Sequence, residues 1–117
     1  MTELMLYHNP RCSKSRAALQ LLEARGLQPT LIRYMETPPS IAELQGLLSK
    51  LELSARQLLR IGEDDYRTLN LADATLTEEQ LIVAMATHPK LIERPILVVG
   101  ARAVIGRPPE KILELLA

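Results

Sequence analysis

Cys12, the single cysteine of this chain, lies where a thiol is well placed to act as a nucleophile. The apolar run Leu4–Tyr7 before it predicts a short strand, and the helical pattern after it ends at Gly26. We therefore expect Cys12 at a strand-to-helix turn, at or just before the first helical residue. There the thiol faces the positive end of the helix dipole and unpaired backbone N–H groups, which we expect to be those of Lys14 and Ser15. Both stabilise the nucleophilic thiolate, so the pKa of Cys12 should lie below the free-thiol value of about 8.5.

Basic side chains surround this cysteine. Arg11, Lys14 and Arg16 crowd the start of the helix, where each positive charge is opposed by the helix dipole by about a few tenths of a kcal/mol. Sequences most often depart from the local preference against cations at a helix start where function requires it, which favours a functional role for these cations. His8 would add a further positive charge when protonated. The alternative interpretation is a buried structural cysteine on a solvated basic turn.

Composition and charge narrow the class of protein. A chain of 117 residues suggests one domain. Lys and Arg together number 14, as do Asp and Glu, and this zero net charge does not indicate nucleic acid or an anionic membrane as a partner. No apolar run approaches the roughly 18 residues of a membrane span, and the N-terminus lacks a signal-peptide pattern. We expect a cytoplasmic monomer.

A single cysteine also excludes several kinds of redox and metal site. It cannot form an internal disulfide, and one cysteine with two histidines far apart in the sequence, His8 and His88, offers too few ligands for zinc. His88 is instead interpreted as a helix-end residue. A phosphatase-type Cys-x5-Arg loop fails because Ala18 stands where the arginine should be, and a Cys-x2-Cys switch fails because Ser15 stands where the second cysteine should be. We expect no bound metal and no bound cofactor.

The elements that must position Cys12 can be predicted in order. Thr30–Tyr34 reads as a second strand, which completes a βαβ unit and should run parallel to the first. Residues 40–92 read as a helical insertion with three capping boxes, which begin at Ser40, Ser54 and Thr77. The first of these helices should bury Leu44, Leu47, Leu48 and Leu51, and the third Leu81, Ile82 and Met85. The second should close near Gly62, and residues 63–74 should form a loop with a helical turn.

In the last third of the chain the hydrophobic pattern changes from helical spacing to that of strands. Ile96–Val99 predicts a buried strand, Ala103–Ile105 its hairpin partner, and Glu110–Leu116 a final helix after two prolines. The order βαβ, helical insertion, ββα is that of an α/β protein with a thioredoxin-like mixed sheet. We predict a single domain over residues 1–117, with the helical insertion at about 40–92.

Three arginines stand at the edges of these elements. Arg60 is expected to end the second inserted helix, Arg94 precedes Pro95 and the third strand, and Arg107 follows the fourth strand. With Cys12 they form a pattern that resembles the glutaredoxin-linked arsenate reductase family, and in particular a short branch of it, over nearly the whole chain. The matching pieces are Tyr7-His8-Asn9-Pro10 with Cys12, Ser15 and Arg16; Leu58-Leu59-Arg60; His88-Pro89; Arg94-Pro95-Ile96; and Arg107-Pro108.

This resemblance implies a mechanism. It implies that Cys12 attacks arsenate, that Arg60, Arg94 and Arg107 hold the oxyanion, and that Pro95 is the cis-proline facing the cysteine. The supporting residues would be His8, Asn9, Ser15 and Arg16. Reduction of arsenate to arsenite takes two thiols and the chain supplies one, so the resemblance implies glutathione as co-substrate and glutaredoxin as the protein partner.

Two other functions share this fold. The first is a glutathione-linked thiol transferase or repair protein, in which Cys12 forms mixed disulfides and the arginines bind glutathione carboxylates. The second is a redox regulator that binds the transcription machinery, which the missing second cysteine disfavours. Arsenate reduction is the function we predict.

Overall fold

The computed structural model describes residues 4–116, which divide into two compact units. The first contains residues 4–37 and 94–116 and carries the sheet. The second is Pro38–Glu93 and is helical. Residues 1–3 and 117 of the predicted domain lie outside the described residues, and the single domain over 1–117 stays a prediction.

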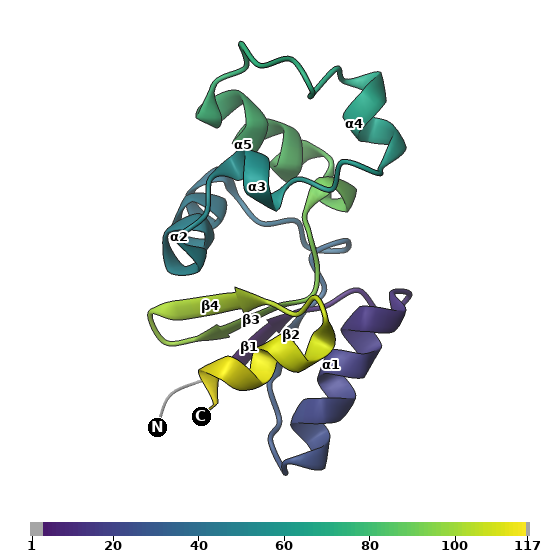
Figure 1. The fold of residues 1–117 in the computed structure, drawn as a ribbon, viewed down its shortest axis with the longest axis vertical. Coiled ribbons are helices and arrows are strands. Elements are labelled where there is room, and N and C mark those ends of the chain that lie inside the picture. The colour runs from purple at the N-terminus through teal and green to yellow at the C-terminus, as the bar shows by residue number, and fades with distance from the viewer. Residues whose placement is uncertain (1–3, 117) are drawn as a thin grey trace. The chain divides into compact units, whose positions relative to one another are not determined.

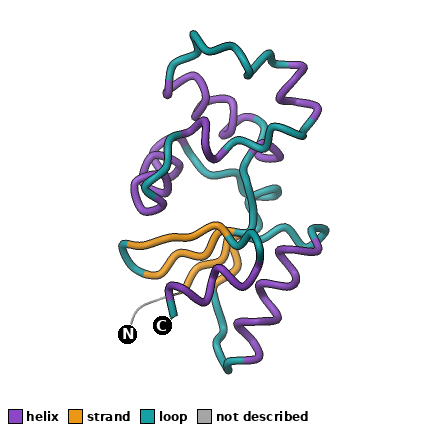
Figure 2. The backbone as a smooth tube through the Cα atoms, viewed as in Figure 1, coloured by secondary structure: helices purple, strands orange, loops and turns teal. Residues whose placement is uncertain are grey.

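The sheet unit holds a four-stranded mixed sheet in the order β2-β1-β3-β4 (Figure 2). Its strands are β1 (Leu4–Tyr7), β2 (Thr30–Ile32), β3 (Ile96–Val99) and β4 (Arg102–Ile105). β1 pairs with β2 in parallel and with β3 antiparallel, and β3 pairs antiparallel with β4. This topology confirms the predicted thioredoxin-like mixed sheet, including the parallel βαβ unit.

Helix α1 (Ser13–Ala24) and the 3-10 helix η2 (Pro109–Leu115) pack against each other beside the sheet (Figure 1). Their shared core consists of fully buried apolar side chains: Leu6, Ala18, Leu22, Leu97 and Ile112. Leu6 and Leu97 are register partners in β1 and β3, so the core begins directly under the central strands. Gly26 ends α1 as predicted, at a φ of +74° that glycine adopts without strain.

Two elements of the sheet unit differ from their predictions. β2 ends at Ile32 instead of Tyr34, because its partner β1 ends at Tyr7, and the N–H of His8 closes the ladder on the Ile32 carbonyl at 2.9 Å. The final helix covers nearly the predicted residues but is a 3-10 helix instead of an α-helix.

The helical unit contains α2 (Ile41–Leu51), α3 (Ala55–Leu58), α4 (Asp64–Thr68), α5 (Glu78–Thr87) and the 3-10 helix η1 (Pro89–Leu91). All three predicted capping boxes form, at Ser40, Ser54 and Thr77. The side chains predicted to face inward are buried: Leu44, Leu47, Leu48, Leu51, Leu81, Ile82 and Met85. No helix in residues 4–116 is long and apolar enough to cross a membrane.

The prediction that Arg60 ends the second inserted helix is wrong. Helix α3 ends at Leu58, and the chain then becomes extended, with a single β-bridge between Leu59 and Ile92. The N–H of Arg60 donates to the Leu91 carbonyl at 2.8 Å, and the N–H of Glu93 donates to the Leu58 carbonyl at 2.9 Å. This pairing with a segment remote in sequence replaces the last helical turn, which was predicted to close near Gly62.

Candidate active site

A tight turn between β1 and α1 positions Cys12. The N–H of Cys12 donates to the Asn9 carbonyl at 2.9 Å, and the side-chain oxygen of Asn9 accepts from the N–H of Arg11 at 3.0 Å. Cys12 is the N-cap of α1, since its backbone is extended and its carbonyl accepts the first helical bond, from the N–H of Arg16 at 3.0 Å. The predicted position at the start of the helix is confirmed.

Hydrogen bonds make the Cys12 thiol acidic. Burial by itself raises the pKa of this thiol, but hydrogen bonds outweigh burial and lower the pKa from the ordinary value of 9.0 to about 7. The strongest comes from the backbone N–H of Ser15, followed by the Arg94 side chain, the N–H of Lys14 and the Ser15 hydroxyl. The two N–H groups expected from the sequence are therefore the ones that face the thiol.

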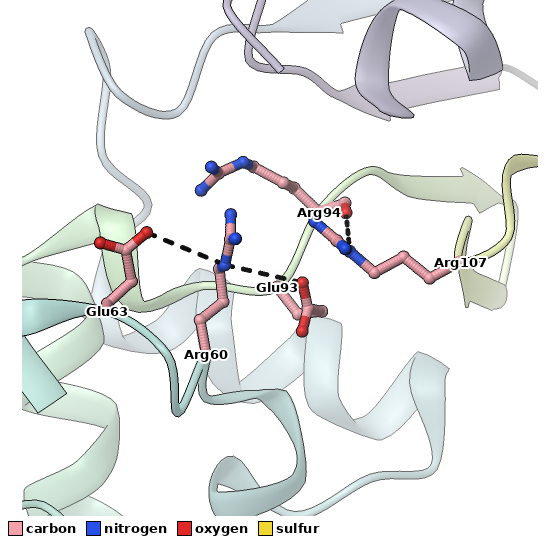
Figure 3. A network of polar contacts seen from close by, with 5 residues as sticks. All are labelled: Arg60, Glu63, Glu93, Arg94 and Arg107. Carbon is pink, nitrogen blue, oxygen red and sulfur yellow. Dashed lines mark hydrogen bonds and ion pairs between the residues drawn. The ribbon is translucent and has the colours of Figure 1, made fainter. Parts of the chain in front are cut away.

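Arg94 and Arg107 lie together in the sheet unit. Burial on its own would lower the pKa of Arg94, but the Cys12 thiol and the Tyr34 hydroxyl beside the guanidinium outweigh it and raise the pKa. Arg107 Nε donates to the Arg94 carbonyl at 2.8 Å (Figure 3). The guanidinium of Arg94 is thus at the thiol, and the side chain of Arg107 is tied to the backbone of Arg94.

Pro95 and Gly106 bring the two arginine-bearing segments close. The peptide bond between Arg94 and Pro95 is cis, as the family resemblance implies, and so is the bond between Arg107 and Pro108. The N–H of Gly106 donates to the Pro95 carbonyl at 2.8 Å. A Cβ at Gly106 would lie 3.0 Å from side-chain atoms of both Pro95 and Ile112, so glycine permits this close approach.

The supporting residues of the sheet unit play different parts. Ser15 is fully buried and its hydroxyl accepts from the N–H of Asn9 at 3.4 Å, while Arg16 donates to the Pro10 carbonyl at 3.0 Å. His8 is 4% exposed, and burial, followed by the charges of Arg33 and Arg16, lowers the pKa of its imidazole below 6.5. His8 is therefore neutral near pH 7, so the positive charge that it would carry when protonated is absent there. Its Nδ1 is buried without a hydrogen-bond partner among the described residues.

Arg60 belongs to the helical unit. Its Nε lies 3.9 Å from Glu63 Oε1 and 3.8 Å from Glu93 Oε1 (Figure 3). Its Nη1 is buried and has no hydrogen-bond partner in residues 4–116. The second ion pair links Arg60 to Glu93, the last residue of the helical unit.

Sequence reasoning missed three residues of this arrangement. Tyr34 was assigned to a strand, but it lies beyond β2, fully buried and beside Arg94. Glu63 and Glu93 were not singled out, because two glutamates thirty positions apart give no local signal that they share one arginine. The catalytic and binding roles of the predicted site residues themselves stay predictions. In residues 4–116 there is no group of three His, Cys, Asp or Glu side chains that would hold a metal ion.

Comparisons with known proteins place this chain in a family. The sequence profile of the ArsC family matches residues 7–115. The chain is 54% identical over 114 residues to YfgD of Escherichia coli K12, a protein named as uncharacterised, with 97% of this chain and 96% of YfgD covered. It is 46% identical over 117 residues to a Neisseria meningitidis protein named arsenate reductase, with 99% and 100% covered. The solved structure of the arsenate reductase from Vibrio cholerae matches with a TM-score of 0.94 at 50% identity, with 97% of each chain covered.

The mixed sheet with a cysteine capping its first helix defines a small thiol protein of thioredoxin-like fold. Within that class, the chain belongs to the ArsC family. The family resemblance inferred from Cys12 and the three arginines is confirmed.

The acidity of Cys12 leads to a direct prediction. Because the pKa is about 7, alkylation by iodoacetamide should rise with pH to a half-maximal rate near pH 7 and then level off. At pH 6.5 the larger thiolate fraction outweighs its lower intrinsic nucleophilicity, so the rate should exceed that of an ordinary cysteine thiol by about tenfold. The measurement is mass-spectrometric alkylation of Cys12 between pH 5 and 9, with N-acetylcysteine as the reference thiol. A rate that still rises steeply above pH 8.5 would contradict the assigned hydrogen bonds.

Proposed function

We propose that this protein reduces arsenate to arsenite with Cys12 as the nucleophile. The observation that carries the proposal is the thiol itself, which is acidic, lies at a helix N-terminus and is hydrogen-bonded by Arg94. Membership of the ArsC family and the names of its curated relatives supply arsenate as the substrate. Arsenate is a tetrahedral oxyanion, and guanidinium groups bind such anions by paired charge-assisted hydrogen bonds.

The proposed reaction has three steps. The Cys12 thiolate attacks the arsenic atom, and one protonated oxygen leaves as water to give a thiol-arsenate adduct. The sulfur of glutathione then bonds to the Cys12 sulfur, while the electron pair of the sulfur–arsenic bond stays with arsenic, so As(V) becomes As(III) and arsenite departs. Glutaredoxin finally takes the glutathionyl group by thiol–disulfide exchange and restores the Cys12 thiolate.

The arginines have separate tasks in this proposal. Arg94 stabilises the thiolate before attack, as its hydrogen bond to Cys12 indicates. Arg107, tied to the Arg94 carbonyl, and Arg60, paired with Glu93 next to Arg94, bind the oxygens of arsenate. Their positive charge offsets the negative charge of arsenate, so the anionic thiolate can approach it.

This function is tested by identifying which reductant supplies the electrons for turnover. With one cysteine the chain cannot form an internal disulfide for thioredoxin to reduce, so arsenate-dependent NADPH oxidation should require glutathione and should rise when glutaredoxin is added. The assay compares glutathione, glutathione reductase and glutaredoxin with thioredoxin and thioredoxin reductase. Full turnover with thioredoxin and no glutathione would rule out the proposed scheme. A protein inert towards arsenate but active on glutathione mixed disulfides would be the thiol transferase instead.

A further inference from the structure

Two carboxylates share the guanidinium group of Arg60. Glu63 Oε1 and Glu93 Oε1 lie on either side of its Nε at 3.9 and 3.8 Å (Figure 3). Backbone hydrogen bonds hold both glutamates there: the N–H of Glu63 donates to the Arg60 carbonyl at 3.3 Å, and that of Glu93 to the Leu58 carbonyl at 2.9 Å. The main chain of both glutamates is therefore held beside Arg60, and both carboxylates pair with its guanidinium.

One terminal nitrogen of the Arg60 side chain lacks a hydrogen-bond partner that an anion could supply. Figure 3 shows the guanidinium group of Arg60 between the two carboxylates, and its buried Nη1 has no hydrogen-bond partner among residues 4–116. An arginine offers five N–H donors in a planar fork, and those of the terminal nitrogens suit a tetrahedral oxyanion. The side chains of Arg60, Glu63 and Glu93 are 22%, 26% and 25% exposed, so solvent screens their charges less than at an open surface.

The charges of this cluster do not balance. One guanidinium and two carboxylates leave a net charge of −1, so an anion bound at the terminal nitrogens is attracted by Arg60 and repelled by both glutamates. Coulomb energy is proportional to the charge of the ligand, so each carboxylate opposes a doubly charged anion twice as strongly as a singly charged one. Removing one carboxylate charge should therefore strengthen the binding of a doubly charged anion more than that of a singly charged one.

We propose that Glu63 and Glu93 are specificity-determining residues that make the Arg60 site prefer singly charged, protonated oxyanions to doubly charged ones. The inference rests on the proposed function, because it assumes that Arg60 binds the oxyanion substrate. Arsenate keeps enough protons to be singly charged in weakly acidic solution, whereas sulfate is doubly charged at every pH of interest. The carboxylate pair thus lets a site built from arginines accept arsenate and discriminate against sulfate.

The experiment compares two anions at one pH. Inorganic phosphate at pH 6 is mainly singly charged and has the shape of arsenate, and sulfate at pH 6 is doubly charged. The measurement is the concentration of each anion that halves the rate of Cys12 alkylation by iodoacetamide, for the wild type, Glu63→Gln and Glu93→Gln. Asp64→Asn is the matched control, because Asp64 adjoins Glu63 but pairs with Arg67 at 2.6 Å. Circular dichroism melting confirms that each variant is folded.

Each glutamine variant should tighten sulfate protection by about tenfold and phosphate protection by only about threefold, while Asp64→Asn should change neither. The double variant should show about the product of the two single effects. The inference is overturned if the anions protect the wild type but the glutamine variants change protection by both anions by equal factors, weaken protection by both, or leave both unchanged. The carboxylates would then only orient Arg60 or stand apart from the site. If neither phosphate nor sulfate protects Cys12 in the wild type, the oxyanion site of the proposed function is overturned, and the inference with it.

Discussion

Replacement of Cys12 by serine is expected to lower kcat/KM for arsenate to the uncatalysed background, a loss of at least about a thousandfold. A serine hydroxyl is not ionised at neutral pH, so the hydrogen bonds that bring the thiol pKa to about 7 cannot make it a nucleophile. Serine also cannot form the disulfide with glutathione through which the proposed cycle returns to its starting state. Steady-state NADPH oxidation with glutathione, glutathione reductase and glutaredoxin measures the loss.

A matched control for this variant is Ser13→Ala. Ser13 is exposed at the first position of α1 and adjoins Cys12, and it is not among the groups that set the thiol pKa. The Ser13→Ala variant should retain most of the wild-type rate. Appreciable turnover by Cys12→Ser in the same assay would remove the covalent adduct from the mechanism.

Replacing any one of Arg60, Arg94 and Arg107 by alanine is expected to lower kcat/KM for arsenate by roughly 10–150-fold. Each guanidinium would supply charge-assisted hydrogen bonds worth roughly 1.5–3 kcal/mol, and 1.4 kcal/mol corresponds to about a tenfold change. Arg60→Ala should lie at the upper end, because it leaves Glu63 and Glu93 facing the anion without their counter-charge. Arg94→Lys should recover only part of the loss, because the ammonium group keeps the positive charge but cannot reproduce the planar fork of the guanidinium.

The structure separates Arg94 from Arg107 in this series. Arg94 lowers the pKa of Cys12 through its hydrogen bond, so Arg94→Ala should shift the alkylation profile of Cys12 to higher pH even without an anion. Arg107 bonds to a backbone carbonyl and is not among the groups that set the thiol pKa, so Arg107→Ala should leave that profile in place. Arg102→Ala, at an exposed position of β4, is the control for a general loss of positive charge. Wild-type kcat/KM in all three arginine variants would contradict an arginine-bound oxyanion.

Features that depend on neighbours within one turn were predictable from the sequence. The capping boxes at Ser40, Ser54 and Thr77 each close within four residues, and all three form. The position of Cys12 at the start of α1, and the backbone N–H groups of Lys14 and Ser15 that face its thiol, follow from the same local geometry. The resemblance to the family added the cis bond before Pro95, which periodicity alone does not reveal.

Tertiary structure decided the charges at the site. Burial together with Arg33 and Arg16 lowers the pKa of His8 and keeps its imidazole neutral near pH 7, which its place before Cys12 does not reveal. Arg94 reaches Cys12 and Tyr34 only because β1, β2 and β3 are adjacent in one sheet. Arg60 meets Glu93 because the Leu59–Ile92 bridge replaces the helical turn that its own sequence suggested. The ionisation and charge of a side chain depend on burial and on groups within a few ångströms, and those groups come from parts of the chain that local sequence patterns do not connect.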